Sequence, residues 1–452
     1  MDLSCFKAYD LRGRVPDQLN PQLAERIGRA YVELTDAKRV VVGYDIRLSS
    51  PEIATALSAG LKAAGADVYD IGLCGTEQVY FATSYYHMDG GIMVTASHNP
   101  KDHNGMKLVE RESRPISSDN GLNTIRERVL EPFDDAPTPG RSEYLTVEPD
   151  YINHLLGFVN GGALSPLKIV VNAGNGGAGP VIDSLARKLP FEFVRLHHQP
   201  DGHFPNGVPN PLLEENRAVT AEAVLREGAD MGIAWDGDYD RCFFFDENGR
   251  FIEGYYIVGL LADQFLRKMG GGRIIHDPRL TWNTRELVQA AGGTAIECKT
   301  GHAFIKQRMR EEDALYGGEM SAHHYFRDFA YCDSGMIPWL LIAERLCQSG
   351  QTLSSLIDAR IEAYPASGEI NRTVEDPARL IDTIEKIYGA DAVSVGYVDG
   401  LSVEFERWRF NLRMSNTEPV VRLNVESRGD IALMKEKTVE LLAAMEQAER
   451  NQ

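Results

Sequence analysis

The sequence of 452 residues has few cysteines and no closely spaced pair of them. The six are scattered without a C-x-x-C spacing, which fits reduced thiols in a cytosolic protein better than a disulfide framework or a zinc site. Positive charge is also scarce, because 47 Lys and Arg residues stand against 66 Asp and Glu residues, for a formal net charge of -19. That charge repels nucleic acid phosphates and anionic membrane surfaces, so we expect neither as a partner. The cysteines are Cys5, Cys74, Cys242, Cys298, Cys332 and Cys347.

Long apolar runs are absent as well. The longest, such as residues 336–343, fall well short of the roughly 18 residues that a membrane-spanning helix needs, so we expect no transmembrane segment. The opening segment MDLSCFKAYDLRGR lacks the basic stretch and apolar core of a signal peptide, so export is not expected. We therefore predict a cytoplasmic protein. We also expect a monomer or weak homo-oligomer.

What is present is a repeated strand-helix-strand pattern, at residues 39–72, 167–197 and 273–298. DIRLSS at 45–50 and DPRLTW at 277–282 follow the first strand of two of these segments, as an internal echo. The pattern predicts three related α/β domains, whose candidate site loops lie beyond the carboxyl ends of the strands. Cys242 and Cys298 lie in strand-like apolar runs and are expected in the core.

From about residue 364 the pattern changes to a strand, a helix, three strands with a hairpin turn at VDG 398–400, and a final helix. This predicts an α+β domain at the C-terminal end. The final helix, about 431–449, is expected to bury one apolar face, formed by Leu433, Val439, Leu442 and Met445. The predicted domains are 1–145, 146–253, 254–363 and 364–452.

The segment at residues 90–107, GGIMVTASHNPKDHNGMK, is a buried strand that ends in small and polar residues. Ser97 lies at the strand end beside His98, and Lys107 follows ten residues later. This arrangement suits a nucleophile or a phosphate carrier. An ordinary serine-rich turn is the alternative, and for an isolated SHNP segment it is the favoured one.

A second strand runs into a loop at residues 231–246, MGIAWDGDYDRCFFFD, where Asp236, Asp238 and Asp240 alternate. Three carboxylates so close together need a cation. An EF-hand is excluded because Arg241 stands where its sixth position needs Gly, and the following CFFF is a strand. An oxygen-only site with few protein ligands is the pattern of Mg²⁺ completed by a phosphate.

Three further loops carry polar side chains. Glu319, Ser321 and His323 alternate in a strand-end loop and can hydrogen-bond vicinal hydroxyls, although a plain polar loop fits equally well. Cationic donors gather at Arg279 and, in KTGH at 299–302, at Lys299 and His302. RMSNTEPVVR at 413–422 has the composition of a phosphate clamp or, with equal weight, of a surface turn. Its polar residues are Arg413, Ser415, Asn416, Thr417 and Arg422.

Together these segments describe a phosphoryl-transfer site. At this point the chain resembles the α-D-phosphohexomutase superfamily over its whole length, most closely the bacterial phosphomannomutase branch. The resemblance rests on the motifs TASHNP (95–100), DGDYDR (236–241), KTGH (299–302), GEMSAHHYF (318–326) and RMSNTEP (413–419).

The resemblance implies a reversible conversion between the 6-phosphate and 1-phosphate of a hexose through a 1,6-bisphosphate, which also serves as activator. It implies a phosphoserine at Ser97, which binds Mg²⁺ together with Asp236, Asp238 and Asp240. It further implies that the C-terminal domain closes a central cleft. The remaining implied catalytic residues are Tyr9, Arg12, His98, Lys107 and His323, with Lys107 and His323 as candidates for proton transfer. The implied substrate-binding residues are Arg241, Arg279, Lys299, His302, Glu319, Ser321, His323, Arg413, Ser415, Asn416, Thr417 and Arg422.

The same resemblance implies mannose phosphate as substrate and a supply of sugar nucleotide, GDP-mannose. Phosphoglucomutase or dual-specificity activity is the alternative within the family, and a phosphoglucosamine mutase is disfavoured by GEMSAHHYF. From other classes, a serine-phosphate, metal-dependent phosphatase and a catalytically silent sugar-phosphate binder remain as alternatives, but the silent binder requires the loss of Ser97 or an aspartate, and none is missing.

Overall fold

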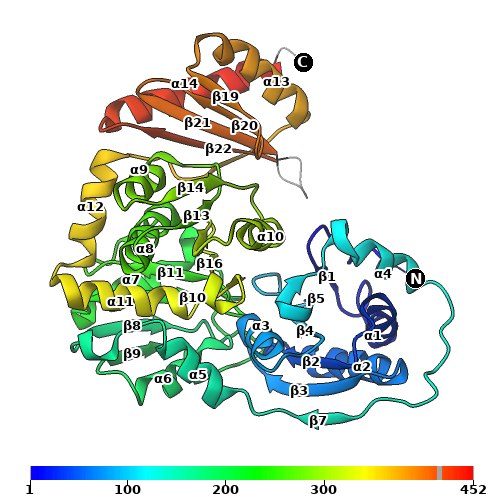
Figure 1. Ribbon diagram of the computed structural model, residues 1–452. Helices are drawn as coiled ribbons and strands as arrows, with labels where there is room; N and C mark the ends of the chain where they lie inside the picture. The colour runs from blue at the N-terminus through cyan, green and yellow to red at the C-terminus, as the bar shows by residue number, and fades with distance from the viewer. Residues whose placement is uncertain (1, 415–419, 451–452) are drawn as a thin grey trace. The chain divides into compact units, whose positions relative to one another are not determined.

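The computed structural model describes residues 2–414 and 420–450, and these form two compact units. Unit 1 holds the described residues up to Phe251 together with Ser321–Thr352. Unit 2 holds Ile252–Met320 together with the described residues from Leu353 onward. The chain therefore passes from one unit to the other three times. Figure 1 traces this path from the N-terminus to the C-terminus.

The first sheet of unit 1 is mixed, and its parallel centre is the segment predicted at 39–72. The strand order is β1-β5-β4-β2-β3-β7, with β6 beside β5. β2 pairs in parallel with β3 and β4, whereas β5 is antiparallel to β4 and β1. The helix between β2 and β3 buries Ile53, Leu57 and Leu61 against the sheet. The strands are β1 (Leu11–Arg14), β2 (Arg39–Tyr44), β3 (Asp67–Leu73), β4 (Gly90–Val94), β5 (His103–Glu110), β6 (Arg114–Pro115) and β7 (Ser142–Tyr144), and the helices are α1 (Pro21–Thr35), α2 (Ser50–Ala63), α3 (Thr76–Tyr85) and α4 (Leu122–Arg128).

The second sheet has the order β12-β11-β10-β8-β9, in which β9 and β10 flank β8 in parallel. Because the chain goes from β8 first to one side and then to the other, a topological switch point lies between β8 and β10. β10 is wholly buried and ends directly before Asp236. The elements are α5 (Glu148–Leu156), β8 (Lys168–Asn172), α6 (Ala178–Ala186), β9 (Glu192–Leu196), α7 (Ala218–Glu227), β10 (Met231–Trp235), β11 (Cys242–Phe245) and β12 (Phe251–Ile252).

The returning segment of unit 1 packs against this second domain. Trp339 lies edge-on to Phe193, with 5.9 Å between the ring centroids, and its helix begins with Pro in the first turn, where the missing N–H costs nothing. The segment contains β16 (His324–Phe326), β17 (Cys332–Asp333) and α11 (Ile337–Ser349).

Unit 2 begins with a third α/β region, in which β13 runs parallel to β14 and β15. The segment predicted at 273–298 is therefore confirmed as strand, helix and strand. Helix α8 of this region is largely buried. Its Phe265 stacks on Tyr316 of β15, with 5.6 Å between the ring centroids. The elements are α8 (Gly254–Met269), β13 (Arg273–His276), α9 (Trp282–Ala290), β14 (Thr294–Glu297), α10 (His302–Glu312), β15 (Tyr316–Gly318) and α12 (Leu353–Ala363).

The tail sheet of unit 2 is antiparallel, with the order β18-β22-β21-β20-β19, and α13 and α14 pack together on it (Figure 1). Residues of β21 alternate between two faces: Phe410 and Leu412 lie in the core with the helices, and Arg409, Asn411 and Arg413 lie on the other face. The elements are β18 (Ile370–Thr373), α13 (Pro377–Tyr388), β19 (Ser394–Gly396), β20 (Leu401–Glu404), β21 (Trp408–Met414), β22 (Val420–Ser427) and α14 (Ile431–Arg450).

Two details of the tail prediction are wrong. Four strands follow α13, not three, because the short β19 precedes the turn that Gly400 makes at a φ of 72°. Val439 is 68% exposed, since the fully buried face of α14 is shifted from the predicted one. Leu433 and Leu442 lie at the margin of this face, and Met445 lies within it. The face consists of Met434, Leu441, Met445 and Ala448.

The remaining structural predictions concern thiols and membranes. Cys242 and Cys298 are buried, as expected, and all six cysteines are free. Among the helices of the described residues, none is both long and apolar enough to cross a lipid bilayer. Short 3-10 helices lie at Arg111–Ser113, Ser118–Asn120, Gly161–Ala163, Glu214–Asn216, Arg327–Phe329 and Gly389–Asp391.

Candidate active site

Ser97 lies in the loop that follows β4, with a left-handed φ of 47° and only 4% of its surface exposed. Its hydroxyl donates to Asp236 Oδ2 at 2.7 Å and lies 3.1 Å from His98 Nδ1. The side chain of Thr95 accepts from the Ser97 N–H. The loop after the first parallel strands thus meets the loop after β10, 139 residues away in sequence.

Asp236, Asp238 and Asp240 form a buried group whose ligating oxygens lie within 4.8 Å of one another. Lys107 Nζ donates to Asp238 at 2.8 Å and to Asp240. Arg241 pairs with Asp236 at 2.7 Å. We call Ser97, Lys107 and the three aspartates the serine-carboxylate cluster.

Burial and neighbouring charges set the ionisation within this cluster. Burial alone would lower the pKa of Lys107, but Asp238 and Asp240 outweigh it and raise the pKa. Burial would raise the pKa of Asp238, but Lys107 and then Arg12 lower it. Burial and the charge of Asp238 raise the pKa of Asp240. Lys107 therefore stays protonated as the counterion of this carboxylate pair.

His98 is held as a neutral ring. Arg241 first, and then burial, lower the pKa of His98 well below its usual range. Because Arg241 Nη2 can only donate, its hydrogen bond to His98 Nδ1 assigns the ring proton to Nε2. His98 Nδ1 is thus an acceptor on the side of Ser97.

Two other predicted residues of unit 1, His323 and Arg12, lie near the same cluster. His323 Nε2 lies 3.7 Å from Asp240 Oδ1, and its Nδ1 lies 3.4 Å from Ser321 Oγ. Arg12 pairs with Asp10 at 2.8 Å. Burial would lower the pKa of Arg12, but Asp10, and then Asp238 and Asp240, outweigh it and raise the pKa. Tyr9 is half-buried and lies two residues before β1 begins.

Arg47 also belongs to this site, although the sequence analysis did not select it. Its guanidinium donates to four backbone carbonyls of the loop 97–103, at distances between 2.6 and 3.0 Å. The side chain is 1% exposed and pairs with Asp45 at 3.3 Å. The echo between DIRLSS and DPRLTW could have identified it, because Arg279 occupies the same place in the second copy.

Thr76 and Asp333 were missed as well. The Thr76 hydroxyl donates to Asp238 at 2.5 Å and lies 3.3 Å from Lys107 Nζ. Asp333 forms a second group of potential metal-ligating atoms with Asp240 and His323. Both residues lie outside the motifs, so no local signal in the sequence marks them.

Unit 2 contains a second polar cluster, built around three guanidiniums. Glu369 Oε2 lies 3.2 Å from Arg279 Nη1 and 3.3 Å from Arg413 Nη2, and Glu369 Oε1 lies 3.4 Å from Arg422 Nη1. Asp277 binds Arg279 on its other side at 2.7 Å. We call Arg279, Arg413, Arg422 and Glu369 the arginine cluster. Its three arginines were predicted from the sequence, whereas Glu369 was not.

The remaining predicted residues of unit 2 lie after β14, after β15 or at the start of α10. Glu319 is 1% exposed and accepts from the Gly301 N–H at 2.9 Å. Lys299 is exposed, with its Nζ 4.8 Å from the centre of the Phe304 ring. His302 is the first residue of α10. The predicted Ser415, Asn416 and Thr417 lie outside the described residues.

Four family models match the chain in order. Three are described as phosphoglucomutase/phosphomannomutase alpha/beta/alpha domains I, II and III, and they match residues 4–133, 149–249 and 253–364. The fourth is the phosphoglucomutase/phosphomannomutase C-terminal domain, which matches residues 369–443. The chain belongs to the phosphoglucomutase/phosphomannomutase family. The predicted fold class is thereby confirmed as four α/β domains.

Relatives agree with the family over almost the whole chain. The chain is 60% identical over 442 residues to "Phosphohexose mutases" of Xanthomonas campestris pv. campestris, covering 98% of this chain and 99% of the relative. It is 56% identical over 452 residues to "Phosphomannomutase" of Escherichia coli strain K12, with coverages of 98% and 99%. A crystal structure of a family protein from Burkholderia thailandensis is 34% identical with a TM-score of 0.90, covering 99% of this chain and 98% of that one. The prediction of an intramolecular phosphotransferase, a phosphohexomutase, is confirmed.

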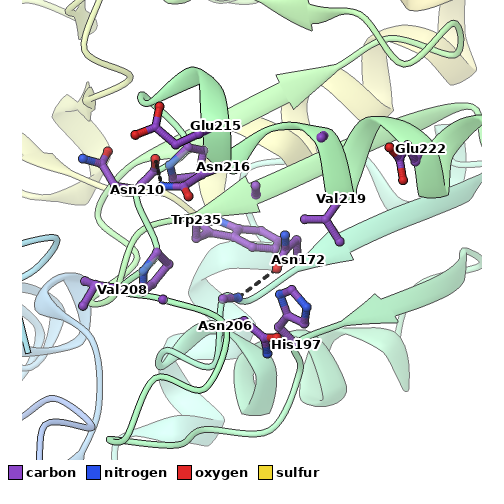
Figure 2. Close-up of a pocket in the computed structure, with 16 residues that line it drawn as sticks. Asn172, His197, Asn206, Val208, Asn210, Glu215, Asn216, Val219, Glu222 and Trp235 are labelled. Carbon is purple, nitrogen blue, oxygen red and sulfur yellow. Dashed lines mark hydrogen bonds between the residues drawn. The ribbon is translucent and has the colours of Figure 1, made fainter.

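A separate cavity of about 480 Å³ lies in the second domain of this family member (Figure 2). Its wall includes the last residues of β8 and β10, Asn172 and Trp235, and His197 directly after β9. The carboxylates of Glu215 and Glu222 line it, and none of its 16 lining residues, all in the described part of the chain, is Lys or Arg. It contains no predicted site residue, and its charge does not suit a phosphosugar.

Proposed function

We propose that this chain is a phosphomannomutase, which interconverts mannose 6-phosphate and mannose 1-phosphate through a phosphoserine at Ser97 and a 1,6-bisphosphate. The observation that carries the proposal is the buried Ser97 hydroxyl, 2.7 Å from Asp236 and beside two further carboxylates and Lys107. The choice of sugar comes from the names of the relatives. Phosphoglucomutase or dual activity is the second candidate, favoured by the family's own description.

Phosphoryl transfer needs little covalent help from a protein, so positioning and charge neutralisation dominate. In the forward step the bond from phosphorus to Ser97 Oγ breaks and a bond to a sugar hydroxyl oxygen forms. The hydroxyl proton passes to a basic side chain, and Ser97 Oγ gains a proton in its place. Lys107, whose raised pKa keeps it protonated, suits the role of acid and counter-charge. His323 is the other candidate for proton transfer. Arg12, Tyr9 and the neutral His98 would orient the reacting groups.

The three aspartates fit Mg²⁺. They offer only oxygen ligands, which suits a hard cation, and Asp238 Oδ1 is buried without a hydrogen-bond partner among the described residues. Asp236, Asp238 and Asp240 would hold the ion together with Ser97, and Arg241 would lie beside the phosphoryl group. When bound, the ion would neutralise charge on the phosphoryl oxygens.

Further polar side chains would bind the rest of the substrate. We propose that Glu319, Ser321 and His323 recognise sugar hydroxyls. The arginines of the arginine cluster would hold the phosphate that does not react. The substrate-binding set is completed by Lys299, His302, Ser415, Asn416 and Thr417. Hexose 1,6-bisphosphate would act as activator by restoring the phosphoserine.

Several broader predictions belong with this proposal. We propose domain limits at 1–145, 146–253, 254–363 and 364–452, with a C-terminal domain that closes over the ligand and excludes water. We also propose that the enzyme is cytoplasmic, as six free thiols favour. It would supply GDP-mannose synthesis and act as a monomer or weak homo-oligomer.

A coupled assay on mannose 1-phosphate and glucose 1-phosphate, with and without the bisphosphate, tests the proposal. We expect turnover of mannose 1-phosphate that depends on bisphosphate and Mg²⁺. The Ser97→Ala variant should lose both turnover and the labelled phosphoprotein formed from a labelled bisphosphosugar. Equal rates on both sugars would establish the dual-specificity alternative. Phosphate release without isomerisation would instead identify a phosphatase and refute the mutase proposal.

A further inference from the structure

Glu369 occupies a central position in the arginine cluster. One carboxylate contacts three guanidiniums, at 3.2, 3.3 and 3.4 Å, and its side chain is 20% exposed. Burial would raise the pKa of Glu369, but Arg279, Arg413 and Arg422 outweigh it and lower the pKa. Glu369 is therefore an anion that already holds the groups proposed to bind phosphate.

The three contacts between Glu369 and the guanidiniums are longer than is usual for an ion pair. Charge-assisted hydrogen bonds between nitrogen and oxygen usually measure about 2.7–2.9 Å, and Arg279 makes such a bond to Asp277, at 2.7 Å. All three contacts of Glu369 are longer. A loose ion pair exchanges its partner at little cost.

Two of the guanidiniums also have an N–H group without an acceptor among the described residues. Arg279 is 3% and Arg413 is 7% exposed, yet the Nε of each is buried without a hydrogen-bond partner among the described residues. A buried donor without an acceptor costs free energy. Further acceptor oxygens, such as those of a phosphate, would satisfy these donors better than one carboxylate does.

We propose that Glu369 is a built-in counter-anion that competes with substrate phosphate for the three guanidiniums and so limits how tightly they hold it. The inference rests on the proposed function, because only a mutase needs such a limit. A bisphosphate intermediate must leave the clamp and return with its other phosphate, so a clamp of maximal affinity would slow turnover. Glu369 thus acts as a positioning and affinity-setting residue rather than a catalytic one.

Calorimetric titration of inorganic phosphate into the full-length protein, in EDTA, tests the competition. Glu369→Gln keeps the shape and removes the charge, so we expect phosphate to bind about 3- to 10-fold more tightly than to the unmodified protein. Glu369→Asp, which keeps the charge but withdraws it from the guanidiniums, should lie between the two and serves if the Gln variant does not fold. Loss of the binding heat in Arg413→Gln assigns it to the cluster.

Glu375→Gln is the matched control, because it removes an exposed carboxylate from the same domain and should leave phosphate affinity unchanged. In the mutase assay Glu369→Gln should lower KM and kcat together, which a merely structural defect would not do. Equal or weaker phosphate binding in Glu369→Gln would overturn the inference. Absence of mutase turnover in the unmodified protein would refute the proposed function instead, while the ratio of phosphate affinities would still report on Glu369.

Discussion

Glu77 illustrates how a single residue supports the serine-carboxylate cluster without belonging to it. Its carboxyl group is fully buried and accepts four hydrogen bonds, from Tyr151 Oη, Ser334 Oγ and the N–H groups of Gly335 and Met336. Three separate segments of unit 1 meet at this side chain. Its neighbour Thr76 donates to Asp238, so displacement of Glu77 would be transmitted to the cluster.

The stability of unit 1 should therefore depend on Glu77 in a pH-dependent way. Burial raises the pKa of Glu77 from 4.5 to about 8, against the opposing effect of its four donors. The folded state then keeps a proton that the unfolded chain releases above its ordinary pKa, so the stabilisation from this group is full at low pH and is lost as the pH rises toward 8. Glu77→Gln does not titrate and turns an N–H toward other donors. We expect it to cost about 1–3 kcal/mol at low pH.

Urea unfolding at several pH values measures this effect. The difference between the original protein and Glu77→Gln should shrink as the pH rises from about 5 to 8. Glu127→Gln, which alters an exposed carboxylate of the same domain, should show a constant small difference. If the difference in unfolding free energy between the two proteins increased with pH, Glu77 would be ionised in the folded state throughout this range.

Site residues that lie in short motifs could be predicted from the sequence, whereas residues whose partners are distant in the chain could not. Ser97 and Asp236 each follow a buried strand. The change there from apolar to polar residues can be recognised in the neighbouring sequence. The hydrogen bond from Gly335 to Glu77 spans 258 residues, and nothing near either residue marks it. Glu369 was missed for the same reason, because its three arginines come from two different predicted domains.

At the scale of elements, the structure repeats one loop. Asp45 follows β2 and Asp277 follows β13, the first strand of each strand-helix-strand segment, and each accepts from the N–H of the arginine two residues later, at 3.0 Å. Each also pairs with that arginine's side chain. In the first copy Arg47 holds the loop of Ser97, whereas in the second Arg279 faces Glu369. One local geometry thus supports a positioning role in one domain and a proposed ligand-binding role in another.

The turn that follows β17 lies directly against the loop of Asp236, Asp238 and Asp240. A Cβ added to Gly335 would lie 2.3 Å from the carbonyl oxygen of Tyr239 and 3.1 Å from that of Arg241. The φ of Gly335 is not positive, so close approach rather than backbone conformation requires the glycine. The Trp235 indole donates to its carbonyl at 2.8 Å, which fixes the contact.

Gly335→Ala should displace the loop of Asp236, Asp238 and Asp240. We expect a stability cost of about 1–3 kcal/mol from overpacking and a fall in kcat/KM of about 100-fold, since misplacement by about 1 Å is enough for that loss. Mg²⁺ affinity should fall with it, measured by activity against metal concentration. Gly396→Ala is the control, because its Cβ would meet no atom within 4 Å. Unchanged Mg²⁺ affinity in a folded Gly335→Ala protein would show that the loop tolerates the shift.

The helices and strands were easier to predict than the exact buried face of a helix or the presence of a very short strand. The three strand-helix-strand segments are confirmed because long periodic patterns of apolar residues specify them. The exposed Val439 and the additional strand β19 were not foreseen, since a helix face can rotate by one position and a strand of three residues has almost no pattern. Tertiary packing decides both.

At the scale of the whole molecule, the net charge of -19 conceals local groups of positive side chains. Lys107 and Arg241 face the three aspartates, and three arginines gather on Glu369. The sequence predicted both groups from motifs but did not predict the division into two units. That division depends on packing between remote segments, such as the contact of Trp339 with Phe193 that ties 321–352 into unit 1.

Removal of residues 364–452 tests whether the C-terminal domain is part of the enzyme. This deletion takes away Glu369, Arg413 and Arg422, so mutase turnover should be abolished. It also removes Glu426, which binds Tyr255, and Arg409, which donates to the carbonyl of Arg279 at 3.0 Å. Loss of activity alone therefore does not separate a missing phosphate site from a damaged third domain.

The double variant Arg413→Gln/Arg422→Gln makes that separation, because the tail sheet keeps its apolar core of Phe410, Leu412 and Leu423. We expect it to fold with little change in thermal midpoint, to lose mutase turnover by at least about 100-fold, and to retain labelling of Ser97 by a bisphosphosugar at high concentration. Lys435→Gln/Lys437→Gln, on the helix of the same domain, is the charge-matched control and should keep full turnover. Full turnover in the deletion protein or in the arginine variant would contradict a phosphate site in this domain, because both proteins lack the two arginines with which the domain is proposed to hold the second phosphate.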